Sequence, residues 1–133
     1  MGDNYIVLII YKLFLSLYSQ MRLIGKQKLE KLKRKNSGNL SLTRDVDTLI
    51  NDIEKGEWKS QTELKSTRSD ADCVHSEGFY FFNIAINRTM ILIEFEDGEA
   101  NVVWVGNHQK YENTFKNNKS TIKKWLKDNN WIE

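Results

Sequence analysis

The chain has 133 residues, 40% hydrophobic and 29% charged, a composition that indicates one globular domain and excludes wholesale disorder. Its single cysteine, Cys73, excludes an internal disulfide and a cysteine-based zinc site, and it fits a reducing intracellular compartment. The formal net charge of +2 is too small to indicate a nucleic-acid partner by itself. The charge is unevenly distributed, however, because seven Lys or Arg and one Glu lie between Arg22 and Lys35.

The first 20 residues differ from the rest of the sequence. The run YIVLIIYKLFLSLY is apolar apart from one lysine and one serine. It is shorter than the roughly 20 apolar residues that span a bilayer, and it lacks the flanks of a secretory signal. We expect residues 1–20 to be an atypical extension of a domain at residues 21–133. A non-native segment upstream of a start at Met21 is the first interpretation. A helix that packs on a partner and a membrane anchor are the alternatives.

Three helices are predicted beyond residue 21. In KQKLEKLKRK, two leucines three residues apart give a thin apolar stripe on a basic helix. Within LTRDVDTLINDIEKG, apolar residues recur at i, i+3, i+4 and i+7, which predicts a helix with Ser41 or Thr43 as N-cap and Gly56 as C-cap. The same spacing in STIKKWLKDNNW predicts a C-terminal helix with Ser120 as its cap.

Strands are predicted on either side of a long polar segment. MRLI, at residues 21–24, is a short strand candidate, and the polar, aperiodic residues 57–78 are expected to form a loop. Three further strands are expected at residues 79–85, 88–96 and 100–107. Asp-Gly between the last two is the strongest short signal of a β-hairpin.

The Asp97-Gly98 turn predicts which residues of the last two strands lie opposite each other. If Asp97 and Gly98 form a two-residue loop, Trp104 lies opposite Ile91 on the apolar face of the sheet, which is the natural core side. An equally tight turn between the first two strands of this group would place Phe82 opposite Ile91 on the same face. Helices are expected to cover this face, and the other face is expected to meet solvent.

The predicted solvent face collects polar side chains. Arg88 is expected opposite Asn107, Asn83 lies on the same face, and His108 follows directly. The simplest interpretation is that polar residues occupy the exposed side of a half-buried sheet. A shared functional site is the alternative, and it draws on one of the two histidines of the chain.

From residue 21 to 131 the sequence resembles HigB toxins, which are RelE-like messenger-RNA-cleaving toxins of bacterial type II toxin–antitoxin pairs. The similarity follows the order of the segments MRLI, two helices, KGEWKS, FYFFNIA, a hairpin and GNHQKYENTF, where members tend to show Thr-His-x-x-Tyr. The resemblance implies an α+β domain with a small antiparallel sheet packed with N-terminal and C-terminal helices.

One departure from the family concerns an arginine. Many members carry a Gly-Asn turn followed by an arginine at the position of Met90, whereas this chain has AINRTM with the arginine at position 88. Because side chains alternate along a strand, Arg88 and Met90 project from the same face, about 7 Å apart. The functional arginine is therefore expected to be moved along the strand rather than lost, which leaves open whether it reaches the same phosphate.

The resemblance also implies the chemistry and its residues. RelE-like toxins resemble metal-free ribonucleases in which the 2′-hydroxyl of RNA attacks the adjacent phosphate, so no metal or cofactor is expected. A histidine can act as acid or base, an arginine can clamp a phosphate, and a tyrosine can stack on a base or orient the phosphate. The expected catalytic residues are His108, Arg88 and Tyr111. The expected RNA-binding residues are Asn83, Lys59, Lys110 and Asn107.

The implied partners follow from the same family. We expect a ribosome-dependent, cytoplasmic endoribonuclease that cleaves messenger RNA and inhibits translation, without a membrane partner. Its cognate antitoxin is expected to be a HigA-like helix-turn-helix DNA-binding protein, and the pair to repress its own promoter. The alternative is a catalytically weak RNA- or ribosome-binding module of the same fold, which would keep affinity without turnover.

Overall fold

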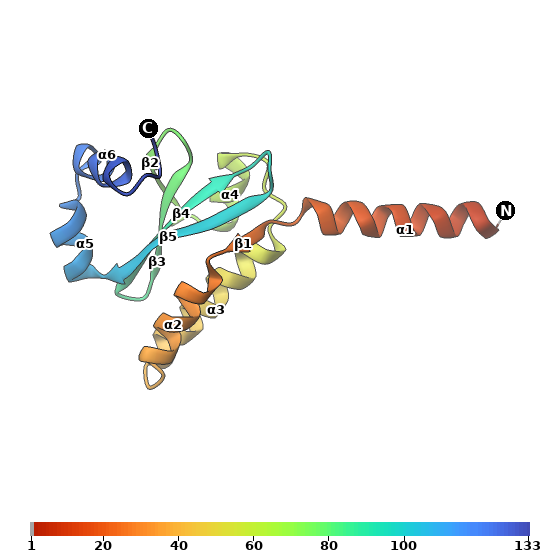
Figure 1. Cartoon of the computed structure of the whole chain (residues 1–133). Coiled ribbons are helices and arrows are strands. Elements are labelled where there is room, and N and C mark those ends of the chain that lie inside the picture. Colours follow the sequence, from red (N-terminus) through yellow and green to blue (C-terminus); the bar gives the residue numbers. More distant parts are fainter. Residues whose placement is uncertain (1) are drawn as a thin grey trace.

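The computed structural model describes the backbone of residues 2–133 and the side chains of residues 4–14 and 20–133. Figure 1 shows a sheet flanked by helices, with one helix pointing away from it. In chain order the elements are α1 (Gly2–Ser19), β1 (Arg22–Ile24), α2 (Lys26–Lys35), α3 (Leu40–Lys55), α4 (Gln61–Thr67), β2 (Asp72–His75), β3 (Phe79–Ile84), β4 (Asn87–Glu94), β5 (Glu99–Asn107), α5 (His108–Phe115) and α6 (Lys119–Asp128). The predicted α+β class is confirmed.

The sheet has five strands in the order β1-β5-β4-β3-β2. The three strands predicted from residue 79 onward form its middle, and their antiparallel pairing is confirmed. At one edge, however, β1 pairs parallel with β5, and Leu23 lies opposite Ala100. Parallel neighbours need a long connection, and all elements from α2 to β4 lie between these two strands. The sheet is therefore mixed.

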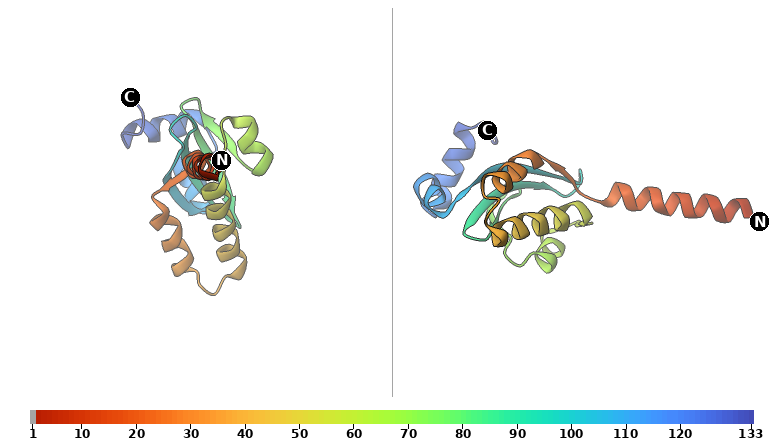
Figure 2. Two further views of the ribbon diagram at one scale, coloured as in Figure 1. Left: turned by 90° about the vertical axis from the view of Figure 1, so that its right-hand side faces the viewer. Right: turned by 90° about the horizontal axis from the view of Figure 1, so that it is seen from below.

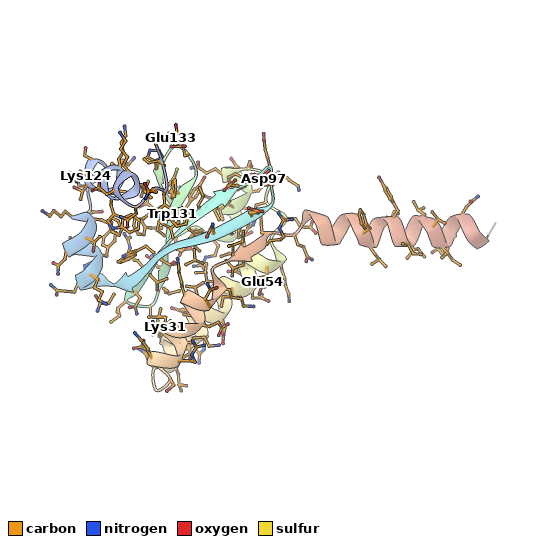
Figure 3. The ribbon with its side chains drawn as sticks, in the orientation of Figure 1. Lys31, Glu54, Asp97, Lys124, Trp131 and Glu133 are labelled. Atoms are coloured by element: carbon orange, nitrogen blue, oxygen red, sulfur yellow. The ribbon has the colours of Figure 1, made fainter. Side chains whose placement is uncertain are left out.

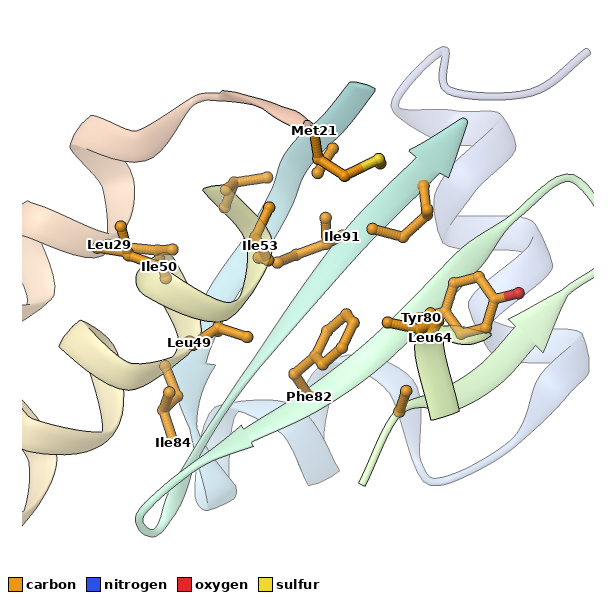
Figure 4. Close-up of a cluster of buried hydrophobic side chains, with 14 of the residues drawn as sticks. Met21, Leu29, Leu49, Ile50, Ile53, Leu64, Tyr80, Phe82, Ile84 and Ile91 are labelled. Atoms are coloured by element: carbon orange, nitrogen blue, oxygen red, sulfur yellow. The ribbon is translucent and has the colours of Figure 1, made fainter. Parts of the chain in front are cut away.

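One face of the sheet packs against α2, α3 and α4. The predicted apolar stripe of α3 is buried, and Figure 4 shows Leu49 and Ile53 facing Phe82 and Ile91 of the sheet. Gly56 is the C-cap of α3, as expected. Burial of side chains such as these removes apolar area from water and stabilises the fold by roughly 1.5–3 kcal/mol each. This first core joins the three helices that precede the central strands to the sheet.

The observed N-caps of α3 and α6 both lie further toward the N-terminus than the predicted ones. Asn39 caps α3, and its side chain accepts a hydrogen bond from the backbone N–H of Leu42, so neither Ser41 nor Thr43 is the cap. Asn118, not Ser120, caps α6. An asparagine oxygen serves this role as well as a hydroxyl does, and each helix simply begins at the earlier of two competent residues.

The opposite face of the sheet is also buried, which corrects the expectation that it meets solvent. Phe81 and Met90 are at most 1% exposed and pack under Phe115 and Leu126 of α5 and α6. The six residues of β3 are all buried except Asn83, the pattern of a strand covered on both faces. The C-terminal helices thus form a second core that the alternation of the strands did not reveal.

The register predicted for the last hairpin is wrong. The loop between β4 and β5 has four residues rather than two, since Glu94 pairs with Glu99. A bulge between Met90 and Ile91 then moves the pairing by a further residue, so Trp104 lies opposite Met90 instead of Ile91. Trp104 therefore packs in the second core, on the same face as Arg88.

The turn between β3 and β4 is also displaced by one residue. Its two central residues are Ala85 and Ile86, because Ile84 pairs with Asn87. Phe82 consequently faces Thr89 rather than Ile91. Ala85 has a φ of 57°. A positive φ is what a two-residue hairpin turn requires at its first central residue.

Residues 57–78 are not a loop, contrary to the prediction. They contain α4 and β2. Ser60 caps α4 by accepting from the backbone N–H of Glu63, and the Glu63 carboxylate accepts from the backbone N–H of Lys59. This Ser-x-x-Glu capping pattern was visible in the sequence. The short β2 has no periodicity of its own and is held by its pairing with β3.

The N-terminal helix α1 extends away from the sheet, as Figure 1 and the right-hand view of Figure 2 show. Several of its apolar side chains are exposed, among them Tyr5, Val7 and Leu13. No helix within residues 2–133 is both long enough and apolar enough to cross a bilayer. The division of the chain into residues 1–20 and a domain at residues 21–133 stays a prediction.

We predict that a shortened chain beginning at Met21 folds with an unchanged thermal midpoint. Met21 is 4% exposed, and its backbone nitrogen donates to the carbonyl of Gly56, a bond that an N-terminal ammonium group can also make. The control is a chain beginning at Gly25, which lacks β1 and should unfold at lower temperature. A loss of cooperative unfolding in the Met21 chain would show that α1 belongs to the domain.

Candidate functional site

The end of the sheet where β3 turns into β4 and β5 leads into α5 holds a cavity of about 640 Å³. Three parts of the chain form it, namely the hairpin turn, the exposed side of α5 and the segment after α5. Its lining residues are Asn83, Ala85, Ile86, Asn87, Arg88, His108, Tyr111, Glu112 and Asn117. Polar side chains gather here because both faces of the strands are buried further along.

Arg88 is the cationic group of this cavity. Its strand partner is Asn83, and the Nε–H of Arg88 donates to the side-chain oxygen of Asn83 at 3.3 Å. The guanidinium carbon lies 4.5 Å from the ring centroid of Tyr111 and 5.7 Å from that of Phe81. A cation over aromatic faces is held by the ring quadrupoles, with an attraction of roughly 0.5–2 kcal/mol per ring. The arginine is therefore positioned before any ligand arrives.

Tyr111 is the aromatic support of the site. Its side chain is 3% exposed and packs edge-on against Phe81, with ring centroids 5.0 Å apart. The hydroxyl donates to the side-chain oxygen of Asn117 at 2.9 Å. Burial raises the pKa of the Tyr111 phenol, while Arg88 lowers it and Asp72 raises it by smaller amounts. This geometry favours the orienting role among the two roles predicted for Tyr111, because protein side chains already contact the ring.

His108 is the first residue of α5, directly after the strand β5. Its ring stacks on Tyr111 with centroids 6.2 Å apart and an interplanar angle of 29°. Its side chain is 69% exposed, and the Nε2 atom lies 3.7 Å from a carboxylate oxygen of Glu112 one helical turn later. The imidazole of His108 is thus mostly exposed to solvent, and it contacts the protein through Tyr111 and Glu112.

The cavity brings together four of the seven predicted site residues, namely Asn83, Arg88, His108 and Tyr111. The other three do not line it. The side chain of Asn107 caps α5 by accepting from the backbone N–H of Lys110. Asn107 pairs with Asn87 and not with Arg88, which corrects the predicted register. Lys110 is exposed on α5, and Lys59 follows Trp58, which belongs to the first core on the opposite face of the sheet.

Five residues of the cavity were missed in the sequence, and two of them contact predicted site residues. Glu112 follows His108 by four positions, so the pair could have been found once a helix was assigned there. Asn117 could not have been found, because it reaches Tyr111 only through the chain reversal after α5. In that reversal Lys116 and Asn117 both adopt left-handed backbone conformations, with φ of 53° and 47°.

The comparison with protein families decides what kind of protein carries this site. Residues 43–114 match the family model described as HigB toxin, the RelE-like toxic component of a toxin–antitoxin system. The chain belongs to this family. The match runs from α3 through α5 and covers more than half of the chain, including Arg88, His108 and Tyr111. The resemblance noted in the sequence is therefore confirmed, and this HigB-type toxin acts with an antitoxin partner. No curated protein matches the chain.

We predict that the ring of Tyr111 stabilises the fold more than its hydroxyl does. Tyr111→Phe removes the bond to Asn117 and should lower the free energy of unfolding by about 1 kcal/mol. Tyr111→Ala removes the support of Arg88 and Phe81 and should lower it by roughly 3–5 kcal/mol. Urea unfolding measures both changes, with Tyr11→Phe on the exposed α1 as the control. Equal stability of Tyr111→Ala and the wild type would contradict this role.

Proposed function

We propose that this toxin is an endoribonuclease and that it cleaves messenger RNA in the cavity between the β3–β4 hairpin and α5. One observation carries the proposal, namely that Arg88 and His108 both contact Tyr111 and line the same cavity. A permanent cation and a titratable imidazole side by side are what cleavage of a phosphodiester requires. Membership in a family of RelE-like toxins agrees with an RNA target.

The proposed reaction uses the nucleophile of the RNA itself. The 2′-oxygen forms a bond to the adjacent phosphorus, and the bond from phosphorus to the 5′-oxygen of the next nucleotide breaks. A 2′,3′-cyclic phosphate and a free 5′-hydroxyl result. One proton leaves the 2′-hydroxyl and another joins the departing 5′-oxygen. His108 exchanges one of these protons and solvent exchanges the other, since an imidazole changes its charge near neutral pH.

Arg88 stabilises the charge that develops on the phosphate in this scheme. Its guanidinium stays protonated at every physiological pH and can hold two phosphate oxygens at once. Because Tyr111 and Asn83 already hold the side chain, little reorganisation is needed when the phosphate arrives. Tyr111 orients this clamp, and Asn83 holds it within the cavity.

The remaining partners are inferred from the family and from charge. We infer a cytoplasmic toxin that cleaves messenger RNA on the ribosome and so inhibits translation, paired with a HigA-like helix-turn-helix antitoxin. The exposed cations of α2 support contact with a polyanion, and Figure 3 shows Lys31 on the outer side of this helix. Lys110, exposed on α5, would add positive charge near the RNA, whereas Lys59 is exposed on the other side of the sheet and would do so only for RNA that extends around its edge. No membrane partner and no metal are part of the proposal.

A specific observation favours a second candidate function. The family's arginine position is occupied by Met90, which is fully buried in the second core and does not line the cavity. Arg88 lies two residues away on the same face, about 7 Å along the strand. If this displacement misplaces the clamp, the protein would bind RNA or the ribosome without efficient turnover.

A cleavage assay separates the two candidates. Purified toxin is mixed with ribosomes carrying a defined messenger RNA, and the fragments are mapped. We expect cuts that disappear when the nucleotide before the cut carries 2′-deoxyribose, because the attacking hydroxyl is then missing. Persistent cutting of the deoxy-substituted RNA would contradict the mechanism, and equally fast cutting of free RNA would contradict ribosome dependence. Ribosome binding without any cut would favour the weak binding module.

We predict that His108→Ala and Arg88→Ala both abolish growth inhibition and keep the fold, but with different kinetic patterns. Loss of a proton-transfer group should slow cleavage by roughly 10²- to 10⁴-fold with RNA binding little changed. Loss of the clamp should also weaken binding. It should reduce the slope of log affinity against log salt by about 0.7, the value for one phosphate contact on a single strand.

The matched control is Lys124→Ala. Lys124 lies on α6, pairs with Asp128 at 2.7 Å and is not among the residues that line the cavity. The substitution therefore removes one positive charge without changing the site. Full toxicity of Arg88→Ala would show that this arginine does not stand in for the family's residue. Full toxicity of His108→Ala would place the reaction elsewhere.

A further inference from the structure

Behind the β3–β4 hairpin lies a group of charged side chains that do not line the cavity. Arg68, the residue after α4, is its centre. One guanidinium nitrogen donates to Asp70 at 2.8 Å and the other donates to Asp52 of α3 at 3.3 Å. The side chain of Arg68 is only 13% exposed, and its guanidinium lies 5.8 Å from the ring centroid of Phe82. The group is more shielded from water than an ordinary surface ion pair.

The charged group bonds to both backbone groups of Asn83, the N–H and the C=O, on the side of β3 away from β4. The backbone N–H of Asn83 donates to the Asp70 carboxylate at 2.9 Å, and Arg68 donates to the carbonyl of Asn83 at 3.3 Å. The pairing of β2 with β3 ends at Asp72 and Phe81, so β2 supplies no neighbour for Asn83 on that side of β3. Asp70 and Arg68 therefore take the place of the missing strand.

The direction of these backbone groups shows how Asn83 meets Arg88. Since the backbone groups of Asn83 point toward Asp70 and Arg68, Asn83 and Arg88 form a non-hydrogen-bonded pair of the antiparallel ladder. In such pairs the two side chains lie closest together. That closeness allows the bond from Arg88 Nε to the side-chain oxygen of Asn83.

The next residues of the hairpin are anchored in a similar way. Asp45 of α3 accepts from the backbone N–H of Ala85 at 2.9 Å, at the residue where the chain adopts a positive φ. The Nε of Arg68 is buried and makes no hydrogen bond among the described residues. The bonds of Arg68 to two carboxylates and to the carbonyl of Asn83 hold its side chain in place although this one donor is unpaired.

We propose that Asp70 and Arg68 are positioning residues of the cleavage site. They fix the backbone at Asn83, and through Asn83 they set the guanidinium of Arg88 over Tyr111 and beside His108. Neither residue touches the RNA. The inference rests on the proposed function, because the residue that they position is the proposed phosphate clamp.

The variant Asp70→Asn tests the proposal. The amide oxygen can still accept from Asn83, but the charge that holds Arg68 is lost. We expect a folded protein whose cleavage is roughly ten- to a hundredfold slower, because misplacement by about 1 Å can cost 10²-fold. If Asp70 acted only through its charge, removing the carboxylate would strengthen the binding of the negatively charged RNA. If Asp70 positions Arg88, the variant should bind RNA more weakly. Unchanged or faster cleavage would overturn the proposal.

A double-mutant cycle separates positioning from a general effect on the fold. If Asp70 acts through Arg88, adding Asp70→Asn to Arg88→Ala should slow cleavage no further. The same slowing in both backgrounds would overturn the proposal. Arg68→Lys, which keeps the charge but loses the planar fork, should behave as Asp70→Asn does. The matched control is Asp47→Asn, which removes an exposed carboxylate of α3 paired with Lys33 and should leave cleavage unchanged.

A measurement without RNA keeps this inference distinct from the proposed function. The Nε–H signal of Arg88 in heteronuclear NMR reports its bond to Asn83 and its place over the ring of Tyr111. Asp70→Asn should move this signal, whereas Asp47→Asn should not. An unmoved signal overturns the positioning role. If the wild type cleaves no RNA, the proposed function fails, and the NMR result still decides whether Asp70 positions Arg88.

Discussion

The β3–β4 hairpin is covered by helices on both faces, and this constraint determines where polar chemistry can take place. Phe82 and Ile91 face the layer of α2, α3 and α4, whereas Phe81 and Met90 face the layer of α5 and α6. A strand buried on both sides offers no surface for RNA along its length. Side chains that could meet the proposed RNA substrate therefore have to project near the turn, where Arg88 lies and where α5 begins.

Features that depend on local sequence could be predicted. The alternation in β3 to β5 places these strands within one or two residues of their observed bounds, and the spacing of apolar residues in α3 places its C-terminal end at Gly56. The register could not be predicted, because the bulge beside Met90 and the four-residue loop are set by packing across the molecule. Trp104 packs between Phe81 and Phe115, with ring centroids 6.3 and 5.0 Å away. No local signal in the strand encodes those contacts.

Four residues of the cavity were predicted, although the predicted register that brought them together was only partly correct. Asn83 and Arg88 share a face in the predicted register and in the observed one, because the two registers differ by two residues and side chains alternate with a period of two. Their neighbourhood with His108 follows from the end of β5 lying beside the hairpin turn. The burial of Tyr111 was not foreseen, because it depends on the second core. Asp70 could not be assigned a role because its link to the site is a bond from the backbone N–H of Asn83 in β3, which no side-chain pattern in the sequence indicates.

The central claim is that Arg88 and His108 form one RNA-binding site around Tyr111. Titration with a short RNA that is made uncleavable by 2′-deoxyribose, on ribosomes or free, can be followed by NMR signals of both side chains. A single shared site predicts that the imidazole signals of His108 and the Nε–H signal of Arg88 move together with one dissociation constant. Movement confined to the lysines of α2, or movement of His108 without Arg88, would contradict the shared site.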